Sequence, residues 1–360
     1  MNERDEPIPL DPWLAASLLQ KAIRRGDAER ARHAALALHR HRGTGIWRRL
    51  TIIAFEDVGI GDLDLVRDVT MCAIDRSVRK PLGPDHEVIA TLVQRLAAAP
   101  KDRSTDYLIC AAKDHPGFDA VRQDIGKLSN DERIAVATDA GQPLVRRAAA
   151  MWYCSGVNGG GPHVLSRGDL PRLLHAFDGL GFPHPLSSIV ETAARKTREP
   201  IAIMLPLLWC LLVESGGGRA TQEMSLPPAP IHRGVPLYAY DKHTRLGKRA
   251  IGHFIRECGD LRRRLGEFVA EFRHRDVAAM AAFYTDAAPL ARRLAWARSE
   301  ELEALGLEAD MRKVGCPREG VEPILDAVRN NLDQLHAIRQ RLLSGGPRNL
   351  GRPSLFRGRV

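Results

Sequence analysis

Apolar residues recur every three or four positions through most of this 360-residue chain, and this period limits its fold more than any other feature. Leu14, Leu18 and Ala22 begin such a stripe near the start of the chain. A second stripe near the end comprises Leu325, Val328, Leu332, Leu335, Ile338 and Leu342, spaced as in the contact face of a helical bundle. Aromatic residues make up only 5 %, while Ala, Leu and Arg are plentiful, which favours helix over strand. We therefore predict an all-α fold built from multi-helix bundles.

Breaks in this helical period divide the chain into parts. Asp27, Asp62 and Asp169 stand just before helical stretches and are predicted N-caps. A Gly-rich run at 215–218, followed by a Pro-rich run at 227–230, is typical of a linker. We predict five parts: a flexible arm (1–12), a first helical domain (13–128), a middle helical region (129–226), a C-terminal helical bundle (227–345) and a basic flexible tail (346–360).

Cysteine usage and the apolar runs restrict the cellular setting. Six cysteines are scattered along the chain without a Cys-x-x-Cys pair, so we expect neither a disulfide framework nor a zinc site. The longest apolar run, 201–213, is too short to span a bilayer and predicts a buried core helix. The charged N-terminus does not have the pattern of a secretory signal. We expect a cytoplasmic protein that binds no membrane, no metal and no cofactor.

Positive charge is concentrated in two segments. The formal net charge is +9, but the last twenty residues hold five arginines and no acid, so the rest of the chain is only mildly basic. The second basic segment spans 245–275. A basic balance of this kind favours a nucleic-acid partner, although an arginine-rich composition also produces it.

Four motifs follow one another in residues 13–115. They are Ala-Ser-Leu-Leu-Gln-Lys-Ala-Ile-Arg-Arg-Gly-Asp (16–27), Trp-Arg-Arg-Leu-Thr-Ile-Ile-Ala-Phe-Glu-Asp-Val-Gly (47–59), Gly-Asp (61–62) and Ala-Ala-Ala-Pro-Lys (97–101), with Tyr107 and Ala111 after the last. Their order and spacing resemble the C-terminal helical region of the RarA/MgsA family of AAA+ ATPases. In that family this region is the counterpart of the clamp-loader collar. The resemblance implies a helical domain that holds subunits together, in proteins that act at stalled or gapped replication forks.

This chain differs from that family in two ways: it has no P-loop sequence, and it has a large side chain before the Glu-Asp-Val-Gly motif. A P-loop needs a Gly-rich turn and a Lys-Ser/Thr pair to hold phosphate and metal. The nearest candidate, Gly247-Lys248-Arg249, has Lys242 at the position of the first Gly and Arg249 at that of Ser/Thr. ATPase activity is therefore not carried over, and no other catalytic motif is present, so we expect a protein that is not an enzyme. Phe55 stands where the family has a small residue.

The most unusual stretch is 238–249, where two tyrosines precede a cluster of cations. Asp241 or Thr244 could cap the helix that follows, and cations in a first turn are unfavourable unless an anion binds among them. The predicted phosphate or nucleic-acid site comprises Tyr238, Tyr240, Lys242, His243, Arg245, Lys248 and Arg249. The alternative is a solvated helix start whose tyrosines pack on the protein body. The arginines between 256 and 275 alternate with acids, which predicts helical salt bridges.

Two further pairs are candidate partner-binding residues. Glu56 and Asp57 lie near the end of a predicted helix, where acids oppose the helix dipole. They either contact a partner or are satisfied within the chain, by capping the next helix or by pairing with Arg48 or Arg49. Leu355 and Phe356, in Ser-Leu-Phe of the tail, resemble the end of a bacterial sliding-clamp ligand; the alternative is that the tail docks on its own body.

Three functional hypotheses remain open at this point. The first is a non-enzymatic accessory factor of DNA replication, repair or recombination that forms homo-oligomers through its helices and contacts DNA through its basic segments. The second is an oligomeric adaptor of a clamp loader, RarA-type ATPase or sliding clamp that makes no DNA contact. The third is an enzyme with an unrecognised, dispersed site.

Overall fold

The computed structural model describes residues 9–157 and 168–345, and about 75 % of these described residues are helical. The predicted helical character is confirmed. The all-α class is too strict, however, because the described residues also form two small two-stranded antiparallel sheets. No helix among the described residues is both long and apolar enough to cross a membrane.

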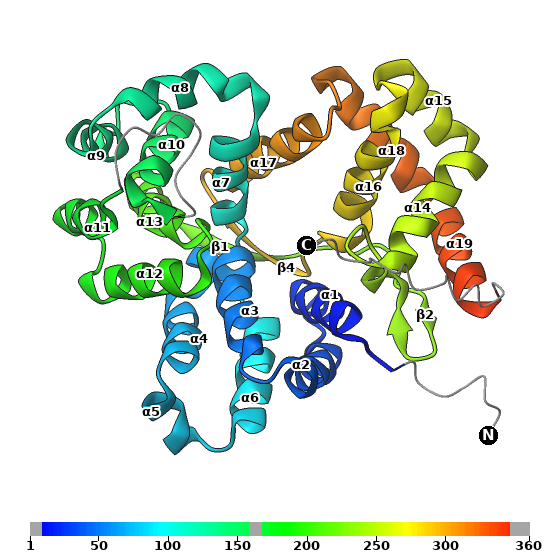
Figure 1. The fold of residues 1–360 in the computed structure, drawn as a ribbon, viewed down its shortest axis with the longest axis horizontal. Coiled ribbons are helices and arrows are strands. Elements are labelled where there is room, and N and C mark those ends of the chain that lie inside the picture. Colours follow the sequence, from blue (N-terminus) through cyan, green and yellow to red (C-terminus); the bar gives the residue numbers. More distant parts are fainter. Residues whose placement is uncertain (1–8, 158–167, 346–360) are drawn as a thin grey trace, which may run out of the picture.

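The helices and strands follow one another along the chain (Figure 1). The first thirteen helices are α1 (Pro12–Arg24), α2 (Ala28–Arg42), α3 (Gly45–Ile53), α4 (Leu63–Ile74), α5 (Arg76–Arg79), α6 (Asp85–Ala98), α7 (Ser104–Asp114), α8 (Asp119–Lys127), α9 (Asn130–Thr138), α10 (Leu144–Ser155), α11 (Leu170–Gly179), α12 (His184–Thr197) and α13 (Leu205–Glu214). They are followed by β1 (Arg219–Glu223), β2 (Ile231–His232), β3 (Val235–Pro236), α14 (Arg245–Glu257), α15 (Gly259–Phe268), α16 (His274–Ala282), β4 (Arg292–Trp296), α17 (Ser299–Lys313), α18 (Val321–Asn330) and α19 (Leu332–Ser344).

The predicted helix starts are confirmed by their hydrogen bonds. The carboxylates of Asp27, Asp62 and Asp169 accept backbone N–H groups at the starts of α2, α4 and α11. For α14 the capping residue is Thr244, whose hydroxyl accepts the N–H of Gly247 at 3.0 Å. These side chains satisfy amides that have no partner within the first helical turn, so each helix begins where its capping residue stands.

Two helices end in π-helical turns that are locally alike. α3 continues into a π-helix at Ala54–Val58, and α16 continues into another at Phe283–Ala287. The fourth residue of each is a fully buried aspartate, Asp57 or Asp286. Each aspartate pairs with the arginine of an Ala-Ile-Arg sequence, Arg24 in α1 or Arg339 in α19. The chain thus uses the same helix-to-turn arrangement twice, which a search for sequence periods does not detect.

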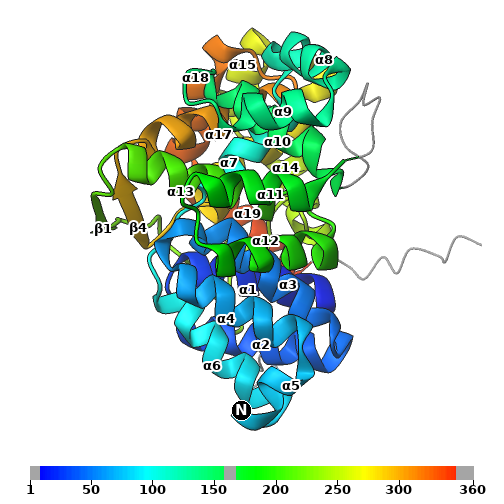
Figure 2. The same ribbon diagram turned by 90° about the vertical axis from the view of Figure 1, so that its left-hand side faces the viewer.

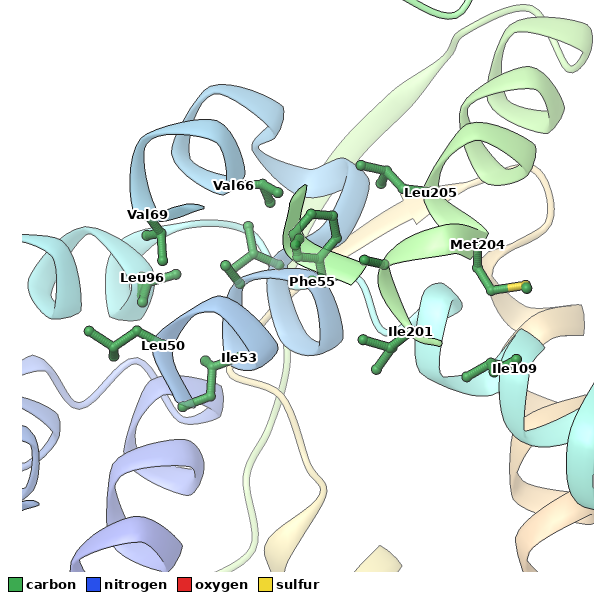
Figure 3. Packing of buried hydrophobic residues seen from close by; sticks show 14 of the residues in the cluster. Leu50, Ile53, Phe55, Val66, Val69, Leu96, Ile109, Ile201, Met204 and Leu205 are labelled. Carbon is green, nitrogen blue, oxygen red and sulfur yellow. The ribbon is translucent and has the colours of Figure 1, made fainter. Parts of the chain in front are cut away.

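The buried apolar residues form two clusters, which we call the first core and the second core. The first core comprises residues between Leu10 and Tyr240, together with Leu294, Trp296 and Leu302. It is continuous across the predicted boundary at residues 128 and 129. Phe55 helps to join the two sides, because its ring lies beside Val66 of α4 and near the 201–205 segment (Figure 3). The apolar run at 201–213 is a core helix, as predicted, in the form of a short 3₁₀ turn and α13.

The second core lies among α14, α15, α16, α18 and α19, drawn from yellow to red in Figure 1. The predicted stripe from Leu325 to Leu342 faces this core, with Val328 and Leu335 fully buried. The stripe runs over two helices rather than one, because the chain breaks at Asn331 between α18 and α19.

The predicted linker is partly a strand, and a later segment returns to pair with it. Residues 219–223 form β1, which pairs with β4 at 292–296. Leu294 and Trp296 of β4, together with Leu302 of α17, belong to the first core although the chain around them belongs to the second. Lys101 also bonds to β4 through its backbone, so β4 lies between Lys101 and β1. The two cores are therefore interleaved in sequence.

Candidate nucleic-acid interface

The two tyrosines predicted to stack on bases are buried. Tyr238 is 2 % exposed and Tyr240 is 5 % exposed. The guanidinium of Arg25 lies 4.3 Å from the centre of the Tyr238 ring. Burial raises the pKa of both phenols to about 12. Neither ring has a free face for a base in this conformation, so the tyrosines pack on the protein body.

Lys242 and His243, which follow the tyrosines, lie against the start of the second π-helix. The Lys242 ammonium is 4.3 Å from the centre of the Phe283 ring and 2.8 Å from the Met280 sulfur. The His243 ring meets the same phenylalanine edge-on, with centroids 6.0 Å apart, but most of its side chain is exposed. Lys242 thus contributes mainly to packing, whereas His243 stays accessible.

Three of the predicted cations, Arg245, Lys248 and Arg249, are exposed on α14, and two of them line a groove. The groove has a volume of about 470 Å³ and lies between α14 and the turn that leads into α16. Its α14 side is made by Lys248, Arg249, Gly252, His253, Ile255 and Arg256, and its other side by Glu271, His274 and Arg275. We call these nine residues the basic groove.

Few opposite charges neutralise the basic groove. Within the described ranges, no carboxylate lies within ion-pair distance of Lys248, Arg249 or Arg256. Arg275 donates to the backbone carbonyl of Lys248 at 3.3 Å, which holds the two sides of the groove together. Glu271 is the one acid in its lining. The groove therefore presents four cations to solvent with one carboxylate among them, an arrangement that attracts anionic ligands.

An aromatic side chain lies in the chain next to this groove. Phe272 is 80 % exposed, which is unusual for a phenylalanine, and it stands between Glu271 and His274, which line the groove. The guanidinium of Arg273 lies 5.3 Å from the centre of the Phe272 ring. An exposed ring beside cations is the combination that proteins use to stack the bases of single strands.

The arginines between 256 and 275 divide into two groups. On α15, Arg263 and Arg264 pair with Asp260 and Glu267, as the alternation of charge predicts. Arg256 and Arg275 instead point into the groove. Sequence reasoning missed His253, His274 and Phe272. The spacing 249, 252, 253 and 256 on one helical face is the signal that could have found the α14 side.

The Glu56–Asp57 pair is satisfied within the chain. Asp57 accepts from Arg24 Nε at 2.7 Å and lies 3.4 Å from Arg103 Nε, rather than contacting Arg48 or Arg49. With no exposed surface, Asp57 offers a partner nothing to contact in this conformation. Glu56 pairs with Arg24 at 2.7 Å and is 17 % exposed, at the edge of a cavity of about 290 Å³. The motifs of the first third thus converge on one buried charge cluster.

A second cavity, of about 610 Å³, lies where the linker meets the second core. Leu226, Pro227 and Pro228 form one side of it, and Tyr284 and Thr285 contribute polar groups. The Tyr284 hydroxyl donates to Asp310 at 2.9 Å. This cavity can accept a small ligand by its size.

The remaining candidates, Leu355 and Phe356, lie outside the described residues.

No group of His, Cys, Asp and Glu among the described residues has the arrangement of a metal site. No protein-family model matches the chain, and neither does any curated protein or solved structure.

Proposed function

We propose that this chain is a non-enzymatic accessory factor of DNA replication, repair or recombination that binds DNA in the basic groove. The observation that carries the proposal is the grouping of Lys248, Arg249, Arg256 and Arg275 around one groove, none of them with a carboxylate partner in the described ranges. Phosphate contacts of this kind supply most of the affinity for nucleic acid regardless of sequence. The resemblance of residues 13–115 to a RarA-type collar supports the setting at replication forks.

Salt dependence tests the phosphate contacts. Four contacts predict that log K falls by about 3 for each tenfold rise in salt with a single strand, and by somewhat more with a duplex. The experiment is fluorescence anisotropy with single-stranded, duplex and forked DNA, using the full chain and a version that ends at Gly345. Binding that persists without the tail places the DNA contact on the folded body, whereas binding that vanishes with the tail contradicts the proposal.

Charge reversal locates the DNA-binding surface. Lys248→Glu with Arg256→Glu should weaken binding by more than tenfold and flatten the salt dependence by about 0.7 for each phosphate that the variant no longer neutralises. The matched control is Arg195→Glu with Lys196→Glu on α12, which makes the same change of charge at two exposed cations that are far along the chain from the groove. Equal binding by the groove variant and the control would contradict the assignment.

Phe272 tests the form of the DNA. Phe272→Ala should weaken single-strand binding by about 1–3 kcal/mol, because the ring on which a base stacks is removed, and should leave duplex binding unchanged. Phe272→Trp should retain single-strand binding, since it keeps a stacking surface. The ring is 80 % exposed, so neither change should alter the stability of the fold. An equal loss for both forms of DNA would contradict stacking at this position.

A further inference from the structure

β1 is an exposed strand whose outer edge no described residue covers. All five of its residues, Arg219–Glu223, are exposed. The strand pairs with β4 on one side, and its sheet contains no other strand among the described residues. Figure 2 shows β1 and β4 at the left-hand margin of the molecule. Exposed strand edges of this kind offer unpaired backbone groups to another strand.

The register with β4 determines which backbone groups point outward. The N–H of Met224 donates to the carbonyl of Ala291 at 2.8 Å, next to the register pair Glu223–Arg292. On the other strand, the Leu294 N–H and the Arg292 carbonyl face away from β1 and bond to Lys101. The backbone groups of successive residues in an antiparallel pair point alternately toward the partner strand and away from it. Thr221 lies opposite Leu294 and Glu223 lies opposite Arg292, so the backbone groups of both residues point away from β4. The same alternation applies to Arg219, two residues before Thr221. The outward-facing residues are Arg219, Thr221 and Glu223.

These three residues of one copy can pair with the same three residues of a second copy that runs in the opposite direction. An antiparallel copy centred on Thr221 places Thr221 opposite Thr221 of the second copy and Arg219 opposite Glu223 of the second copy. Each of these pairs can exchange two backbone hydrogen bonds, because the same residues face outward in both strands. We propose that β1 pairs with β1 of a second copy of this chain, antiparallel across a two-fold axis at Thr221.

Charge selects this arrangement over others. Cross-strand threonine pairs and opposite-charge pairs stabilise a sheet, whereas like charges directly opposite one another destabilise it. A parallel, in-register pairing would put Arg219 against Arg219 of the second copy. In the two-fold arrangement, Glu223 lies between Arg292 of its own chain, at 3.0 Å, and Arg219 of the second copy.

The residues at the ends of β1 leave room for this pairing. The small area that the two strands would bury indicates a weak dimer. Met224, which is 41 % exposed, would lie opposite Gly218 of the second copy, where no side chain obstructs it. Nothing lies within 4 Å of where a Cβ would stand on Gly218. Two five-residue strands bury less area than a permanent dimer needs. We therefore expect a dimer that dissociates on dilution.

The test is sedimentation velocity of the full chain over a wide range of protein concentration. Thr221→Pro removes the outward N–H at the two-fold axis and spares the bonds to β4, which residues 220 and 222 make. This variant should remain a monomer at concentrations where the wild type is a dimer. Thr221→Val is the matched control, because it keeps the N–H and the branched side chain, and it should still form the dimer.

Charge exchange gives a second test that does not depend on proline. Glu223→Arg places two arginines opposite each other across the interface and should weaken the dimer. Arg219→Glu with Glu223→Arg should restore the dimer when Arg292→Glu is added, because residue 223 then keeps an oppositely charged partner within its own chain. A wild type that stays monomeric at all concentrations would overturn the proposal, and so would a Thr221→Pro variant that dimerises like the wild type. Either result leaves the DNA-binding proposal untouched, since β1 does not line the basic groove.

Discussion

At the residue scale, the most consequential group is a carboxylate with no exposed surface. Asp57 accepts from Arg24 at 2.7 Å and from Gln20 at 3.0 Å, and lies 3.4 Å from Arg103. Removing one partner of a buried ion pair leaves the others charged and without compensation. We therefore expect this carboxylate to stabilise the first core, in which Glu56 and Asp106 also pair with the same arginines.

Asp57→Asn should destabilise the protein by about 3–5 kcal/mol, because Arg24 and Arg103 then lack their central carboxylate. Urea unfolding measures this change. Asp68→Asn is the matched control: Asp68 pairs with Arg67 at 3.0 Å and Arg95 at 2.9 Å on the surface. Its removal should cost no more than about 1 kcal/mol. Similar destabilisation of both variants would show that the Asp57 cluster is not specially stabilising.

A second buried carboxylate makes stability depend on pH. Burial raises the pKa of Asp102 to about 6, against the lowering effect of hydrogen bonds from Trp296 and Ser104. The unfolded value is about 3.9. Between these values the folded protein holds a proton that the unfolded chain has released. The wild type should therefore lose stability as pH rises from about 4 to about 6, and remain at the lower level above that.

Asp102→Asn should remove this dependence, because the side chain no longer titrates. Its single amide oxygen can keep the bonds from Trp296 and the Ser104 hydroxyl at Oδ2, while the Ser104 N–H loses its acceptor at Oδ1. The stability of the variant relative to the wild type should rise by about 2 kcal/mol between pH 4 and pH 7. Urea unfolding at the two pH values provides the measurement. Asp64→Asn, at a largely exposed carboxylate of α4, is the control and should show no such change. The same relative stability at both pH values would contradict the prediction.

At the element scale, helix contacts depend on single glycines. Gly306 of α17 lies directly on the Tyr107 ring of α7, where an added Cβ would meet the Tyr107 Cβ at 2.6 Å. α17 carries Leu302 into the first core, so its distance from α7 positions the whole helix. The glycine permits a close approach that any side chain would prevent.

Gly306→Ala should cost about 1–3 kcal/mol, because α17 must move away from α7 to make room. Gly266→Ala on α15 is the matched control, since nothing lies within 4 Å of where its Cβ would stand. That change should stabilise the protein by about 0.5–1 kcal/mol, through the higher helix propensity of alanine. Thermal unfolding of the two variants should give shifts of opposite sign, and a stabilised Gly306→Ala variant would contradict the packing argument.

The elements also indicate how far the sequence alone can lead. Helix starts were predictable because a capping residue acts on the amides next to it, as at Asp27 and Asp62. The strand at 219–223 was not, because its pairing partner lies about seventy residues later at 292–296. The exposed cations of α14 could be found from their spacing. The burial of Tyr238 and the exposure of Phe272 depend on which helices pack over them, and no local pattern carries that information.

At the scale of the whole molecule, the two cores are tied together by charge as well as by chain. Consecutive arginines at the end of α1 reach both π-helices, since Arg24 pairs with Asp57 and Arg25 donates to the Asp286 carbonyl at 2.8 Å. Burial opposes ionisation of Asp286, but Arg339 and His336 outweigh it and lower its pKa to about 2. The second core is therefore anchored to the first through buried, charged contacts.

Separate fragments 9–240 and 241–345 should not fold as the intact chain does. The first would lack Leu294, Trp296 and Leu302, and the second would expose them. The control is the intact protein cut at a protease site inserted at Gly217, in an exposed turn with open space around it. The cut protein should stay associated and keep its near-UV circular dichroism, whereas each fragment alone should lose that signal. Cooperative unfolding of the isolated first fragment would contradict this expectation.

The return of β4 and α17 to the first core also has a consequence for synthesis. Residues 1–240 are synthesised well before Leu302, which is the last buried residue of the first core. At about 5–20 residues per second, the gap of roughly sixty residues lasts from about 3 to 12 seconds. During that interval the apolar surface that will receive Trp296 and Leu302 remains uncovered. The nascent chain therefore has a defined period in which a chaperone can bind it, and this period ends when α17 emerges.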